Sequence, residues 1–66
     1  MWVSVYVAPN RRVAVIIKEL LEIEGILVKL KESSSPAKEK RNMEVMVSDL
    51  EIEEANEVLN NALQSF

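Results

Sequence analysis

Three short segments of the chain alternate between side chains that would point inward and side chains that would point outward. This period-two pattern, rich in valine, is typical of half-buried strands. The predicted strands span residues 2–7, 26–31 and 43–47. In the first strand the alternation places its three valines on one face and Trp2, Ser4 and Tyr6 on the other. Pro9 ends this strand, because proline has no N–H to donate to a sheet.

Two longer segments repeat apolar residues every three or four positions, as an amphipathic helix does. The predicted helices span residues 11–24 and 49–64. Asn10 is a favourable N-cap for the first helix, and Gly25, the only glycine, stands where a helix-ending residue takes a positive φ. Ser48 and Glu51 have the spacing of a capping box at the start of the second helix.

A polar segment separates the second and third predicted strands. Residues 33–42 are long for a hairpin connection, and we expect a flexible loop there. The element order is therefore strand, helix, strand, strand, helix within a single domain covering residues 1–66.

This order predicts an α+β fold, a ferredoxin-like split βαβ arrangement (βαββα) that lacks its last strand. A right-handed crossover from the first strand to the second leaves room for the third strand between them. The sheet order would then be 1-3-2, with both helices on one face. The orders 3-2-1 and 2-1-3 remain open at this point.

The predicted sheet leaves two surfaces uncovered. The first strand lies at an edge, and residues 2–7 carry none of the charges that usually protect an edge from pairing. The face away from the helices holds aromatic and other apolar side chains of the kind found at interfaces. We therefore expect a homodimer that forms through the sheet edge or the open sheet face. The candidate interface residues are Trp2, Ser4, Tyr6, Leu27, Lys29 and Met46.

Composition supports self-association and excludes several kinds of chemistry. A chain of 66 residues, 48% of them apolar, has a small core and gains stability from association. It contains no cysteine and no histidine, which excludes disulfides, Cys/His zinc sites, thiol redox chemistry and imidazole bases. The carboxylates at Glu51, Glu53, Glu54 and Glu57 are expected to be solvated. We predict no catalytic, cofactor-binding or metal-binding residue, and hence no enzyme.

Charge is divided unevenly along the chain. All eight basic residues lie within residues 1–41, whereas residues 42–66 hold six acidic residues and no basic one. This division indicates either a solvated acidic helix or complementary patches on two copies of the chain. The net charge of −3 makes nucleic-acid binding unlikely, although Trp2 and Tyr6 beside lysines would suit base stacking. With no long apolar run and no signal-peptide pattern, we expect a cytoplasmic protein without membrane contact.

A possible ligand site lies at the start of the first predicted helix. Arg11 and Arg12 place two guanidinium groups beside free helix-terminal N–H groups, with Asn10 at the border. This arrangement suits a small anion or an acidic metabolite. The alternative is a pair of solvated arginines.

Four segments of the sequence resemble segments of a known protein family. They are VYVAPN at 5–10, IKELLEIEGI at 17–26, VMVSD at 45–49 and the Glu54–Ala55 pair. Together they resemble a family of small bacterial domains, the prokaryotic signal-transducing proteins. The resemblance covers nearly the whole chain. It implies a compact ferredoxin-like module with a role in signalling or regulation, and it implies no catalytic residue.

These observations predict a small non-enzymatic module that acts in regulation, signal transduction or protein interaction. We expect it to work as a homodimer with no cofactor, and a further protein partner is compatible with this expectation. One alternative is a sensor of small anions or metabolites at the start of the first helix. Another is an accessory subunit of a larger enzyme.

Overall fold

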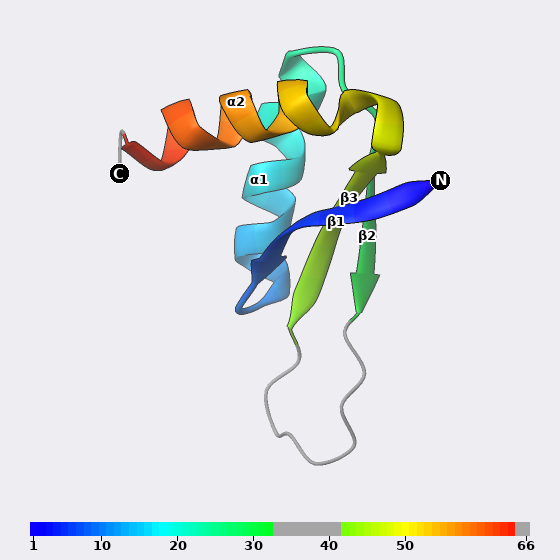
Figure 1. Ribbon diagram of the computed structural model, residues 1–66. Coiled ribbons are helices and arrows are strands. Elements are labelled where there is room, and N and C mark those ends of the chain that lie inside the picture. Colours follow the sequence, from blue (N-terminus) through cyan, green and yellow to red (C-terminus); the bar gives the residue numbers. More distant parts are fainter. Residues whose placement is uncertain (33–41, 65–66) are drawn as a thin grey trace.

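The computed structural model describes residues 1–32 and 42–64, and the predicted loop at 33–42 therefore lies outside the described residues except for Asn42. These described residues form three strands, two helices and a short 3₁₀ turn (Figure 1). In order, these are β1 (Trp2–Ala8), α1 (Arg11–Ile23), β2 (Val28–Glu32), β3 (Met43–Ser48), η1 (Asp49–Glu51) and α2 (Ile52–Gln64).

The three strands form one sheet in the order β1-β3-β2. The central strand, β3, is antiparallel to both neighbours. β1 and β2 consequently run parallel to each other and are linked by α1, which is the connection of a split βαβ unit. The α+β, ferredoxin-like prediction with sheet order 1-3-2 is confirmed, and the two other strand orders are excluded.

The ends of α1 follow from local sequence. The side-chain oxygen of Asn10 accepts a hydrogen bond from the backbone N–H of Val13 at 2.9 Å, as an N-cap does. At the other end, Gly25 has a φ of +84° and its N–H donates to the Glu22 carbonyl at 2.9 Å. The N–H of Ile26 donates to the Leu21 carbonyl at 3.1 Å, which completes a Schellman motif.

The second helical segment begins differently from the prediction. The Ser48 hydroxyl accepts from the N–H of Leu50 at 3.2 Å, two residues along, and Asp49–Glu51 form a 3₁₀ turn. The α-helix itself starts at Ile52. Tightening of a first turn into 3₁₀ geometry is common at helix ends.

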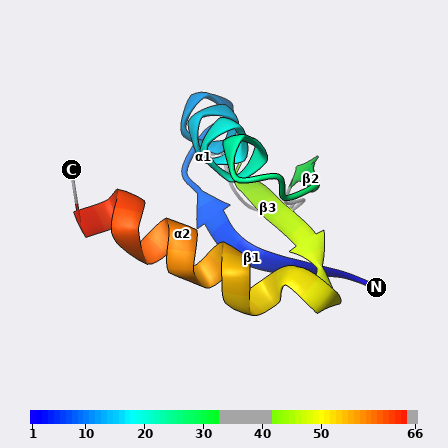
Figure 2. The same cartoon turned by 90° about the horizontal axis from the view of Figure 1, so that it is seen from above.

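The hydrophobic core lies on one face of the sheet. Both helices pack against this face, α1 along β2 and β3 and α2 toward β1 (Figure 2). The core contains no polar or charged residue among those that the structure describes. Its buried residues are Ala8, Ala14, Ile17, Leu21, Ile26, Met43, Val45, Val47, Ala55 and Leu59.

A bulge in β1 corrects the predicted orientation of its second half. Val3 pairs with Val47, but the register shifts between Ser4 and Tyr6, so that Tyr6 pairs with Val45. An extra residue in one strand inverts the alternation that follows it. Tyr6 therefore packs against the core, whereas Val7 is 53% exposed. The prediction that Tyr6 shares a face with Trp2 was wrong.

The second strand begins two residues later than predicted, at Val28. Ile26 belongs to the helix-ending motif and is buried in the core. Leu27 follows it as an exposed residue just before β2. The apolar alternation at this position therefore includes part of a turn as well as the strand.

Candidate functional site

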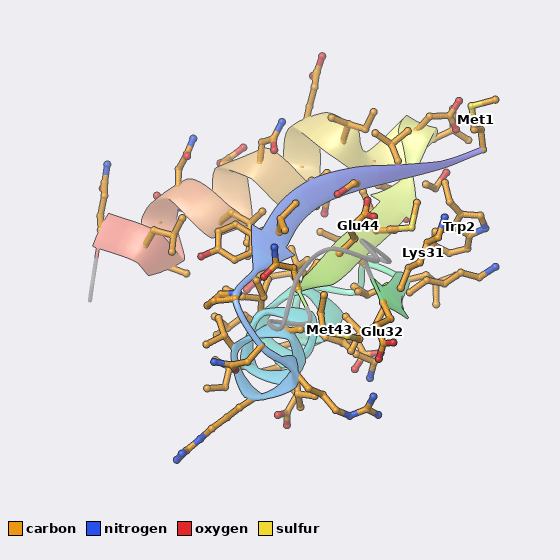
Figure 3. The ribbon with its side chains drawn as sticks, turned by 90° about the horizontal axis from the view of Figure 1, so that it is seen from below. Met1, Trp2, Lys31, Glu32, Met43 and Glu44 are labelled. Carbon is orange, nitrogen blue, oxygen red and sulfur yellow. The ribbon has the colours of Figure 1, made fainter. Side chains whose placement is uncertain are left out.

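The sheet face opposite the helices is the most distinctive exposed surface among the described residues. We call it the open face and define it by seven residues. They are Trp2, Ser4 and Val7 of β1, Glu44 and Met46 of β3, and Lys29 and Lys31 of β2. In Figure 3, Trp2 and Lys31 lie on the side of the sheet away from α1, whereas Met43 of the core lies toward α1.

Trp2 and Lys29 are in contact on the open face. The Lys29 ammonium nitrogen lies 4.5 Å from the centre of the Trp2 ring, within the range of a cation–π interaction. The two residues come from the two outer strands, so the contact spans β3. Trp2 remains 37% exposed in this position. The contact joins Trp2 to Lys29 while leaving part of the aromatic surface accessible.

The remaining side chains of the open face are arranged in rows across the sheet. Met46 is paired with Ser4 on one side and with Lys29 on the other. Glu44 is paired with Val7 on one side and Lys31 on the other. Opposite charges directly across a strand pair stabilise a sheet by a few tenths of a kcal/mol, on the order of 0.2–1. The face therefore combines an aromatic and apolar strip with two lysines and one carboxylate.

Four of the six predicted interface residues lie together on the open face: Trp2, Ser4, Lys29 and Met46. Leu27 lies next to β2 and is 71% exposed. Tyr6 is directed to the core, which leaves Trp2 as the one aromatic residue on this face among the described residues. Stacking of successive nucleic-acid bases would need more than one such ring.

The sheet edge at β1 is less regular than predicted. Within the described residues, β1 has a strand partner only on the β3 side. The bulge at Val5, however, interrupts the even spacing of its backbone groups. Bulges are among the devices that keep an edge strand from pairing with another chain. The edge is thus a poorer template for continuing the sheet than its lack of charge suggested.

One residue of the predicted anion site, Asn10, has a structural role as the N-cap of α1. The Asn10 side-chain oxygen caps α1 through the N–H of Val13, and Arg11 and Arg12 are exposed. Asn10, Arg11 and Arg12 lie close together in the structure only because they are adjacent in the sequence. The anion site stays a prediction.

A second surface, which the sequence did not indicate, is a groove between the two helices. Its volume is about 560 Å³, and α2 crosses the end of α1 beside it. Its lining residues are Leu20, Ile23 and Glu24 of α1 and its C-cap, and Glu54, Glu57, Val58, Asn61 and Ala62 of α2. The sequence held a partial signal, because Ile16, Leu20 and Ile23 repeat at helical spacing beside the core-facing residues of α1.

The carboxylates of the described residues are spread out. No three of them lie close enough together to hold a metal ion within residues 1–32 and 42–64. Neither of the two described helices has the length and apolar content that crossing a membrane requires.

Comparisons with known proteins do not assign the chain to a family. No protein-family model, no curated protein and no solved structure matches the chain. The resemblance to prokaryotic signal-transducing proteins stays a prediction from the residues quoted above, and function has to be argued from the surfaces of the molecule.

Proposed function

We propose that the chain is a non-enzymatic regulatory or signal-transducing module that self-associates through its open face. The observation that carries this proposal is the Trp2 ring, held across the sheet by Lys29 and still accessible. Tryptophan is among the residues that most often anchor interfaces. The regulatory role comes from the family resemblance, and the absence of histidine and cysteine agrees with a module that does not catalyse.

The face is favoured over the edge because of the bulge. Edge pairing requires a regular row of N–H and C=O groups along β1, and the bulge at Val5 breaks that row. A face-to-face contact uses side chains instead and does not depend on the ladder. In a symmetric pair, Lys31 of one copy can form an ion pair with Glu44 of the other copy, because both residues lie on the open face.

The contact should be weak. Three strands spaced by about 4.8 Å, each about five residues long, give a face of roughly 15 by 17 Å. Two such faces of about 250 Å² each bury roughly 500 Å² in total, well below the roughly 1,200 Å² at which standard specific interfaces begin. We therefore expect a monomer–dimer equilibrium that responds to concentration, which suits regulation by protein level or by a partner.

Sedimentation velocity tests the proposal over a concentration series from about 10 μM to 1 mM, the range in which weak interfaces associate. We expect the mean mass to rise from 7.5 kDa toward twice that value. The Trp2→Ser variant should remain a monomer, whereas Leu50→Ser, which removes an exposed side chain from η1, should associate normally. A 7.5 kDa species alone at the highest concentration would refute self-association.

Tryptophan emission distinguishes the face from the edge. Trp2 is the only tryptophan, so its emission should shift to shorter wavelength as the face becomes covered. Pairing through the edge would leave the emission unchanged and would instead slow hydrogen exchange at the outward N–H groups of β1. That second pattern would contradict the choice of the open face.

A further inference from the structure

We propose that the groove between α1 and α2 binds a basic amphipathic helix of a partner protein. This surface lies on the helix side of the molecule, and the inference does not depend on self-association through the open face. The groove combines an apolar floor, an acidic rim and the C-terminal end of α1.

The floor of the groove consists of its apolar lining residues, which the core covers only in part: Leu20 and Val58 pack against the core but are not fully buried. α1 buries Ala14, Ile17 and Leu21 against the sheet, yet Ile23 remains 78% exposed. A helix that is apolar beyond its core-facing stripe usually packs against a second element. Val58 and Ala62 of α2 complete the floor from the other side, and they are spaced one helical turn apart.

The rim of the groove is acidic. Glu24, Glu54 and Glu57 line it, and its lining contains no lysine or arginine. The last turns of α1 and α2 contain no basic residue either. The C-terminal end of α1, where Glu24 is the C-cap, adds the partial negative charge of a helix terminus. An occupant is therefore expected to carry positive charge around an apolar centre.

These features together favour a helix as the occupant. Two helices that line an apolar groove can receive a third helix by ridges-into-grooves packing, with leucine-like side chains placed three or four residues apart. Lysines or arginines that flank this stripe would face the three carboxylates on the rim. The dispersed carboxylates do not form a metal site among the described residues, so a metal ion is not the matching ligand.

The test uses a model peptide of leucine and lysine, patterned as an amphipathic helix of about four turns, roughly 14 residues. A peptide with the same leucines and glutamate in place of lysine is its control. Binding is followed by the backbone amide shifts of the ¹⁵N-labelled full chain. We expect the leucine–lysine peptide to move the signals of Leu20–Glu24 and of α2, and the glutamate peptide to leave them unchanged.

Matched variants separate the groove from general attraction to an acidic protein. Ile23→Ser should weaken binding about tenfold by removing buried apolar area, whereas Leu50→Ser, an exposed residue outside the groove, should not. Glu57→Gln should weaken binding about two- to fivefold, and Glu53→Gln on the same helix but outside the lining should have little effect.

Several outcomes would overturn the inference. They are equal losses in Glu53→Gln and Glu57→Gln, equal binding of the two peptides, or no binding up to about 1 mM, the weak end of measurable affinity. Shifts of the groove signals with protein concentration alone would assign the groove to a second copy, which also contradicts the proposal. Trp2 emission distinguishes the two surfaces, because peptide binding at the groove should leave it unchanged.

Discussion

The two faces of the sheet are built from the same strands and carry different side chains. On β3, Val45 and Val47 are fully buried beneath the helices, whereas Glu44 and Met46 on the opposite face are only partly covered. The core side therefore supplies most of the apolar burial that stabilises this small domain. The open face contributes less to stability, and its side chains are consequently available for contacts with another molecule.

The largest expected effect comes from placing a charge on the buried face. Val45→Asp puts a carboxylate at a position with 0% exposure in a core that has no polar partner for it among the described residues. Burying an unpaired charge costs more than the roughly 5 kcal/mol that a small domain has available. We expect the variant to be unfolded at 25 °C by far-ultraviolet circular dichroism.

The matched variant on the other face is Met46→Asp. The new carboxylate remains accessible to water and lies beside Lys29, so only the strand propensity of aspartate opposes it, by about 1 kcal/mol. This protein should fold and unfold cooperatively in urea. If both variants unfolded equally, the distinction between the two faces would be wrong.

A smaller effect tests the bulge in β1, which decides the face to which each residue belongs. Tyr6→Ala should lower the free energy of unfolding by about 2 kcal/mol, because Tyr6 is half-buried against the core. Val7→Ala should change it by no more than about 0.5 kcal/mol, since Val7 is exposed. Urea denaturation measures both values. Regular alternation without a bulge predicts the reverse order.

The smallest expected effect concerns the contact across the open face. Lys29→Met keeps the length of the side chain but removes its charge above Trp2. The loss should be about 0.5 kcal/mol, as for an exposed cation–π pair, and Trp2 emission should change. Lys31→Met on the same strand is the control and should leave the emission unaltered. Identical emission changes in the two variants would mean that Lys29 has no special contact with the ring.

The sequence was sufficient to predict which helices and strands form and where α1 begins and ends, because these features depend on residues that are close together in the chain. The start of β2 and the start of α2 were predicted less accurately. Asn10 caps the helix three residues before Val13, and Gly25 ends it with the expected positive φ. The sheet order 1-3-2 was favoured by the right-handed crossover, but the orders 3-2-1 and 2-1-3 stayed open until the pairing of β3 with both β1 and β2 excluded them. At both ends of α1, the local preferences of individual residues therefore agree with the observed structure.

The candidate site was predicted only in part. Trp2, Ser4, Lys29 and Met46 precede the bulge in β1 or lie on strands of regular register, and their shared face was predicted correctly. Tyr6 follows the bulge and was placed on the wrong face. A run of valines with one tyrosine has no residue that identifies an insertion, because valine and tyrosine are suited to either side of a half-buried strand.

The groove shows a second limit of sequence patterns. Helical spacing placed Ile23 in the apolar stripe of α1, but the structure buries only Ala14, Ile17 and Leu21 of this helix and leaves Ile23 exposed. Glu54 and Glu57 become part of one surface with Glu24 only because α2 crosses α1 near its C-terminal end. A carboxylate that looks simply solvated on an isolated helix thus becomes part of the rim of an apolar groove.

The sequence by itself determined how many helices and strands form, their order and the signals that start and end each helix, because backbone preferences, capping and periodicity act between near neighbours. Only the tertiary structure decided that Tyr6 faces the core, that Trp2 meets Lys29 across β3 and that the two helices enclose an acidic groove. These features depend on strand register and helix crossing, which are set by packing between residues far apart in the chain.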